Sequence, residues 1–197
     1  MNHSEAIHFE SVGPFTVEIV PDADCENPIE DYCWWEGAAL CLDFGRYGEL
    51  KTPALKDTTP QQLLDMVRHG DGGSNDYKGW HIFPVYAYIH SGITINLGGF
   101  SCPWDSGQCG FIAVNPKEYP DEGGAYKYAQ AMIETADDYL TGNVYGWVVK
   151  DTAGEVVESA WGYFGDYDKS GCLDEGKNCA SGLIANAEHH TEAHAVD

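Results

Sequence analysis

The sequence predicts an α+β fold, in which two main helices pack on an antiparallel sheet of about six or seven short strands built from hairpins. Three observations lead to this fold class. Short β-rich segments follow one another with turn residues between them. Two helical segments stand well apart in the chain. The regular alternation of strands and helices that builds a parallel nucleotide-binding sheet is missing.

Most of the expected strands lie in the first 114 residues. Alternating or apolar β-rich segments predict strands at 15–20, 38–44, 80–89, 93–97 and 110–114. The three residues His-Ser-Gly separate the third of these strands from the fourth. We therefore expect them to form a tight hairpin turn.

Helical patterns occupy two further segments. Residues 59–69 begin with a Thr-Pro pair typical of a helix start, and residues 125–140 predict the longer helix. After it, the β-rich segments 143–150 and 156–162 are joined by the turn-forming residues 151–155. This arrangement predicts a β-hairpin.

The chain of 197 residues is long enough for one domain with a proper core. We expect residues 1–12 to be a loose lead-in and residues 13–180 to form a single α+β domain. Residues 181–197 are expected to form a short helix and a polar, His-rich tail.

The charge of the chain is unusual. It has 32 acidic and 10 basic residues, a net charge of −22. Such a field repels phosphates, which argues against nucleic acid and anionic membrane as direct partners. Three explanations remain open: solubility, binding of a cationic partner or cations, and mimicry of the charge of DNA. No apolar run is long enough to predict a membrane-spanning helix.

The seven cysteines are an odd number, and the first ten residues lack the basic and apolar regions of a secretory signal. Both observations favour reduced thiols in the cytoplasm.

Chemically capable side chains concentrate between His90 and Gly110. We expect the hairpins to place His90 beside Cys102, with Asp105 near them. A thiol, an imidazole and a carboxylate form a set suited to nucleophilic catalysis. However, Pro103 biases the preceding backbone toward extended geometry, so this cysteine does not open a helix as a papain-like nucleophile does.

Two other interpretations of the same segment remain open. In the first, it is a rigid loop whose Asp and Ser side chains cap backbone N–H groups and whose tryptophan is a plug. In the second, it lines a pocket for a ligand or partner. The candidate pocket residues are Ser91, Trp104, Ser106, Gln108 and Trp161.

A metal site is a further candidate. Asp166, Asp168, Ser170 and Asp174 match the spacing of the first half of a calcium-binding loop. The position that should carry a bidentate glutamate is Lys177, so a solvated turn is the alternative. No cofactor is expected elsewhere, and Ca²⁺ is the one metal that this pattern would admit.

Four segments together resemble a family of small bacteriophage and mobile-element proteins that has no assigned activity. They are YIHSG at 88–92, FSCPWDSGQ at 100–108, YLTGNVYG at 139–146 and WGYFG at 161–165. The resemblance covers roughly residues 80–166, and its second motif is the most specific. It implies a phage accessory protein that acts in the host cytoplasm against host defences, and it carries over no catalytic role.

These observations predict a non-enzymatic phage-type accessory protein. Its expected partner is a host protein with a basic surface, from defence or nucleic-acid handling, bound through the acidic surface of this chain. A Cys/His-dependent hydrolase or transferase is one alternative, and a protein that sequesters a small ligand is another. The sequence does not predict an oligomeric state.

Overall fold

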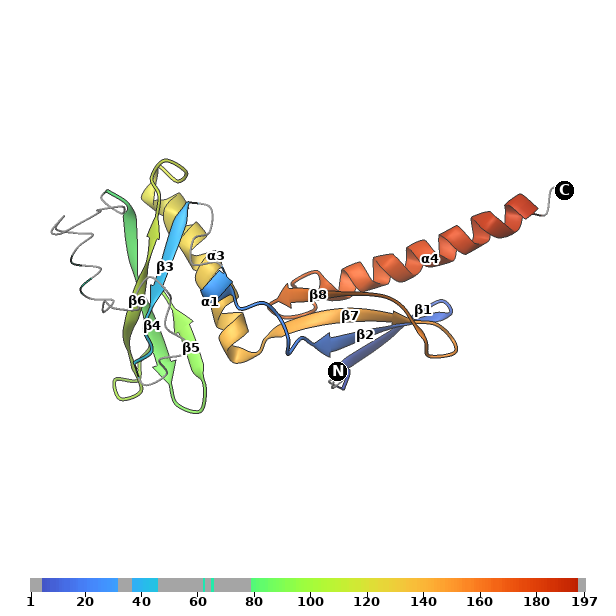
Figure 1. Ribbon diagram of the computed structural model, residues 1–197, viewed down its shortest axis with the longest axis horizontal. Helices are drawn as coiled ribbons and strands as arrows, with labels where there is room; N and C mark the ends of the chain where they lie inside the picture. The colour runs from blue at the N-terminus through green and yellow to red at the C-terminus, as the bar shows by residue number, and fades with distance from the viewer. Residues whose placement is uncertain (1–4, 32–36, 46–61, 63–64, 66–78, 195–197) are drawn as a thin grey trace. The chain divides into compact units, whose positions relative to one another are not determined.

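The computed structural model of the chain describes residues 5–31, 37–45, 62, 65 and 79–194. Its contacts divide the chain into two compact units (Figure 1). Met1–Cys25 and Gly142–Asp197 form one, called here the terminal unit, and Glu26–Thr141 form the central unit. The helix predicted over 59–69 lies outside the described residues except Gln62 and Asp65, which are helical.

The α+β class is confirmed. The prediction of a single sheet is wrong, because the strands form two antiparallel sheets of four strands each. In the terminal unit the order is β1 (His8–Val12), β2 (Phe15–Pro21), β7 (Val144–Lys150) and β8 (Val156–Phe164). In the central unit the order is β3 (Ala38–Leu42), β6 (Ser106–Val114), β4 (His81–Ile89) and β5 (Ile93–Asn96). Strands β2 and β7, which lie far apart in the sequence, pair with each other in the terminal sheet. Each of the two sheets has its own apolar core.

Three helices occur among the described residues: α1 (Pro28–Asp31), α3 (Glu122–Thr141) and α4 (Cys172–His194). Within that part of the chain, none of them has the length and apolar character needed to cross a membrane. The longer helix predicted over 125–140 is confirmed as α3. Asp121 caps it by accepting a hydrogen bond from the backbone N–H of Gly124 at 2.7 Å.

Helix α3 packs on the central sheet through small and medium side chains. The buried residues on this helix are Ala125, Ala129, Met132, Ile133 and Ala136. They belong to the same core as residues of β3, β4, β5 and β6. Asp137 of α3 also accepts a hydrogen bond from the backbone N–H of Ile95 at 2.7 Å, so a carboxylate satisfies a donor on the edge strand β5.

Strand β6 is longer than predicted because it continues through the candidate segment. It begins at Ser106, four residues before the expected start at Gly110. A register shift leaves Cys109 as an extra residue opposite β4, which is a β-bulge. On the other side of β6, a Cβ on Gly110 would lie 1.9 Å from the Cys41 carbonyl oxygen, so only glycine lets β3 pair here.

In the terminal unit, α4 packs on the sheet through a core that includes Val17, Ile19 and Trp147. The predicted β7–β8 hairpin is confirmed. Two segments differ from the prediction. Residues 8–12, expected to be a loose lead-in, pair with β2 as strand β1. Helix α4 begins nine residues before the predicted start at 181. Gly176 lies in the added part, and it lets the helix approach the sheet, because a Cβ there would lie 2.8 Å from a Val17 methyl group.

Candidate functional site

The structure brings the two candidate segments together in the central unit. Strands β4 and β6 pair so that Tyr88 lies opposite Ser106. The backbone N–H of Ile89 donates a hydrogen bond to the Asp105 carbonyl at 2.8 Å. Beyond β4, His90 turns back through a hydrogen bond from its N–H to the Gly92 carbonyl at 3.2 Å. This confirms that the histidine turn and the cysteine loop lie side by side.

Three predicted catalytic side chains meet at one carboxylate oxygen. The Cys102 Sγ lies 3.8 Å from the Asp105 Oδ2, to which it donates a weak hydrogen bond. The His90 Nδ1 lies 3.8 Å from the same oxygen. The imidazole and the thiol therefore both contact the carboxylate. In a catalytic nucleophile–base pair, by contrast, the imidazole accepts the hydrogen bond of the thiol, whereas here the carboxylate accepts it.

The loop places its tryptophan in solvent. The Ser106 hydroxyl donates a hydrogen bond to the Cys102 carbonyl and closes the turn over Pro103–Asp105. Trp104 is 90% exposed, so the interpretation of this residue as a plug is wrong. The physical reason is the turn itself, because it is closed by backbone and hydroxyl groups and requires no apolar filling beneath it.

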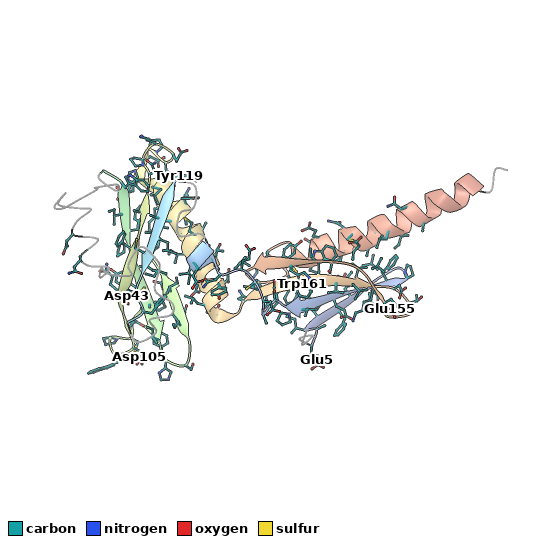
Figure 2. The ribbon with its side chains drawn as sticks, in the orientation of Figure 1. Glu5, Asp43, Asp105, Tyr119, Glu155 and Trp161 are labelled. Atoms are coloured by element: carbon teal, nitrogen blue, oxygen red, sulfur yellow. The ribbon has the colours of Figure 1, made fainter. Side chains whose placement is uncertain are left out.

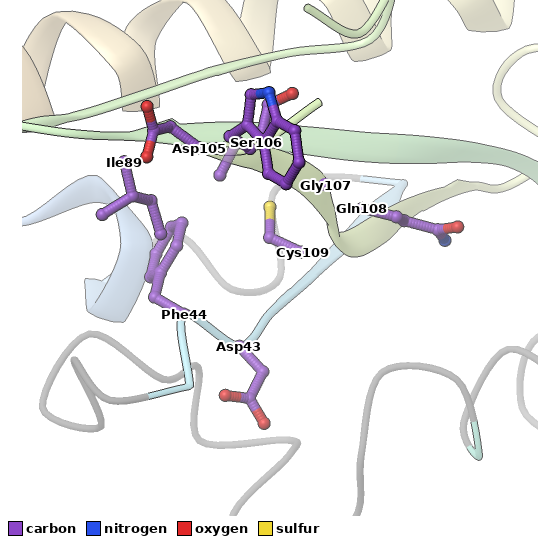
Figure 3. Close-up of a pocket in the computed structure, with 10 residues that line it drawn as sticks. Asp43, Phe44, Ile89, Asp105, Ser106, Gly107, Gln108 and Cys109 are labelled. Carbon is purple, nitrogen blue, oxygen red and sulfur yellow. The ribbon is translucent and has the colours of Figure 1, made fainter. Parts of the chain in front are cut away.

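A pocket of about 470 Å³ opens beside this turn (Figure 3). Ten of the residues that the structure describes line it: Asp43, Phe44, Ala87, Ile89, Trp104, Asp105, Ser106, Gly107, Gln108 and Cys109. Three of the five predicted pocket residues are therefore present, whereas Ser91 lies exposed in the hairpin turn and is not among the lining residues.

The fifth predicted pocket residue, Trp161, belongs to β8 of the terminal unit, while Asp43 and Asp105 belong to the central unit (Figure 2). Trp161 is 48% exposed, and its ring lies over Gly146, where a Cβ would come within 2.3 Å of it. A β-bulge at Trp161 and Gly162 accommodates this contact, because two residues of β8 stand opposite Gly146.

Sequence reasoning missed the contribution of β3 to the pocket. Asp43 and Phe44 follow β3 directly, and the Asp43 N–H donates to the Cys109 carbonyl at 2.8 Å. They reach the pocket because β3 pairs with β6 beside Gly110. That glycine was the available signal, since a glycine inside a strand marks the close approach of another backbone.

Cys109 lines the pocket but is not a candidate nucleophile. Its side chain is buried, and its Sγ lies 3.5 Å from the Val85 carbonyl oxygen. Burial raises the pKa of the Cys109 thiol to about 12, with a smaller contribution from the negative charge of Asp43. The thiol is therefore protonated at neutral pH, and the reactive form of cysteine is the thiolate.

The predicted calcium-binding residues occupy the turn before α4. The Lys169 ammonium lies 3.0 Å from the Asp166 carboxylate, and a hydrogen bond with Asp168 holds the pKa of Asp166 below its usual value. Ser170 has a buried hydroxyl that no group of the described residues hydrogen-bonds, and Asp174 lies in the first turn of α4. Across the described residues, no three His, Cys, Asp or Glu side chains are arranged to hold a metal ion.

Another polar network in the terminal unit links α4 to its sheet. The Trp147 indole N–H donates to the Tyr163 hydroxyl at 2.9 Å, and that hydroxyl donates to the Glu175 carboxylate. Burial and the bond to Glu175 raise the pKa of Tyr163. Its hydroxyl stays protonated at neutral pH, so this network is structural.

Comparison of the chain with protein-family models, curated proteins and solved structures gives no match. The resemblance to phage proteins stays a prediction.

Proposed function

We propose that this chain is a non-enzymatic binding protein that engages a basic protein through its acidic surface. The observation that carries the proposal is the net charge of −22. Complementary charge accelerates association and selects partners of opposite sign.

The internal ion pairs support the proposal. Lys150 binds Glu18 at 2.8 Å, and Lys177 binds Glu10 at 2.8 Å. Lysines that pair with carboxylates of the chain itself offer little positive potential to a partner. The excess of carboxylates therefore dominates the field around the protein.

The candidate site also favours binding over catalysis. Its two thiols, on Cys102 and Cys109, contact a carboxylate and a backbone carbonyl, and neither group is a base suited to activating a thiol at neutral pH. In contrast, a tryptophan 90% exposed at the rim of a pocket is typical of a recognition surface, since tryptophan is among the residues that dominate binding energy at interfaces.

The resemblance to phage proteins gives this proposal a setting. The partner would be a host protein that is basic because it handles nucleic acid, and the complex would form in the host cytoplasm. In this account the acidic surface competes with nucleic acid for the partner.

The test is capture of proteins from a host-cell extract by the immobilised chain, at about 0.05 M and about 0.5 M salt. We expect the low-salt fraction to be rich in proteins of high Lys and Arg content, and salt to release them because it screens surface charge. A captured set that is unchanged by salt, or that shows no bias toward basic proteins, would contradict the proposal.

A further inference from the structure

We propose that the pocket beside Trp104 receives one arginine side chain of the basic partner. This inference rests on the proposed function and assigns the pocket as the point where the partner is anchored.

The first argument is the aromatic rim. Trp104 is 90% exposed, although its indole is among the largest apolar groups of the chain. An exposed indole next to a pocket offers its face to a planar cation. Guanidinium groups stack on tryptophan and are attracted by the negative potential of the ring face.

The second argument is the charge of the lining. Asp105 follows Trp104 directly, and Asp43 comes from the end of β3. Figure 3 shows their carboxylates at two edges of the pocket, with Cys109 between them. Among the described lining residues there are two carboxylates and no lysine or arginine, so the charge of the pocket repels an anion and attracts a cation.

The third argument is that one carboxylate is held in place and the other is accessible. Asp43 Oδ1 accepts the Gly45 N–H at 2.8 Å. The Asp105 side chain is 40% exposed, and its Oδ2 lies 3.8 Å from both Cys102 Sγ and His90 Nδ1. A carboxylate that is already ordered loses little freedom when a guanidinium binds, and an accessible one can form a charge-assisted hydrogen bond with it.

The fourth argument is the match between the pocket and the stem of an arginine. Half-buried Ile89 supplies apolar surface to the lining, with the buried Phe44 and Ala87 behind it, and Cys109 is protonated there. Methylene groups of a long cationic side chain pack on such surface while the charged end reaches polar groups. A volume of about 470 Å³ is ample for one side chain.

The experiment titrates N-acetyl-arginine amide into the full chain and follows the indole N–H resonance of Trp104 by NMR, assigned with Trp104→Ala. We expect a saturable shift with the arginine compound and none with its uncharged citrulline counterpart. Asp43→Asn with Asp105→Asn should weaken binding at least about tenfold, because the pocket then loses both negative charges, including the one that the guanidinium hydrogen-bonds.

The matched control is Glu155→Gln with Glu158→Gln on the exposed surface of the terminal unit, which removes the same charge. We expect it to change the affinity less than about twofold. If both double variants weakened the binding of the arginine compound equally, the assignment of the pocket as the arginine site would be overturned. The binding would then reflect only general charge attraction. No shift of the indole with the arginine compound would overturn the assignment as well, and salt-sensitive capture of basic proteins would then show that the proposed function still holds.

Discussion

At the scale of single residues, the carboxylate of Asp105 determines what the candidate site can do. It lies 3.8 Å from both the Cys102 sulfur and the His90 ring. The imidazole and the thiol therefore each interact with this carboxylate. The thiol donates its hydrogen bond to this carboxylate, so the acceptor placed to receive its proton is the carboxylate and not the imidazole.

This geometry predicts the reactivity of Cys102. In His90→Ala, whose wild-type side chain is 68% exposed, we expect the rate of Cys102 alkylation by iodoacetamide to stay within about twofold of the wild-type rate. Mass spectrometry of the labelled peptides measures the rate from pH 6 to 8. A decrease of about tenfold or more would show that the histidine activates the thiol and would restore the catalytic alternative.

Cys109 predicts a pH dependence of stability. The ordinary pKa of the thiol is 9.0, and burial raises it to about 12 in the folded chain. Below pH 9 the thiol is protonated in both states, so its contribution to stability is fully present. Between pH 9 and 12 the unfolded state loses the proton and the folded state keeps it, so stability falls as pH rises, by up to about 1.4 kcal/mol per pH unit.

The measurement is urea unfolding of the wild type and Cys109→Ala between pH 8 and 10.5. Other groups titrate equally in both proteins. We therefore expect the stability deficit of Cys109→Ala to shrink as pH rises above 9. A deficit that is constant over this range would show that the thiol is not buried as described.

At the scale of elements, glycines decide how closely strands and helices approach. The pairing of β3 with β6 depends on Gly110, where a Cβ would lie 1.9 Å from the Cys41 carbonyl oxygen. Gly110→Ala should therefore reduce the free energy of unfolding by about 3 kcal/mol, since backbone atoms must shift. Gly107→Ala, in the same strand with no atom of the described residues within 4 Å of its Cβ, should change it by less than about 0.5 kcal/mol.

Both variants are compared by urea unfolding, and amide exchange of β3 locates the effect. Equal stability of the two variants would contradict the close approach of β3 to β6.

Helix α4 offers a second pair of glycines with opposite expected effects. A Cβ on Gly176 would lie 2.8 Å from a Val17 methyl group and 3.1 Å from the Trp147 Cβ, while in the described part of the chain nothing lies within 4 Å of a Cβ on Gly182. Gly182→Ala should raise the melting temperature, because alanine favours a helix by about 1 kcal/mol over glycine. Gly176→Ala should lower it by overpacking the core, and an increase for both variants would show that α4 does not pack this closely.

The elements also show how much of the fold can be predicted from the sequence. Alternation located β2 and β5, and a turn-rich connection located the β7–β8 hairpin, because these are local properties of the chain. The partition into two sheets depends on which distant strands pair, as β2 and β7 do, and local pattern does not contain that information. The start of α4 was missed because Gly176 and Gly182 weaken its helical pattern.

The same distinction applies to the candidate site. His90, Cys102 and Asp105 could be grouped from the sequence, because a hairpin and a neighbouring strand bring nearby segments together. Asp43 and Phe44 could not, because they enter the pocket through the pairing of β3 with β6. The exposure of Trp104 also escaped prediction, because composition does not show which way a turn directs its side chains.

At the scale of the whole molecule, the net charge of −22 is the basis on which we propose a basic partner. Diffuse charge attracts any basic surface, but specificity requires a defined anchor. The pocket supplies that anchor in this account, since it combines an exposed indole with carboxylates from two segments.

The measurement that tests this account most directly is an NMR map of amide shifts during titration with a short peptide of alternating arginine and serine. We predict the largest changes at residues 43–44, 87–89 and 104–109, and smaller changes for a citrulline peptide of the same length. Largest changes in the terminal unit, or equal changes with both peptides, would contradict the assignment of this pocket as the binding site.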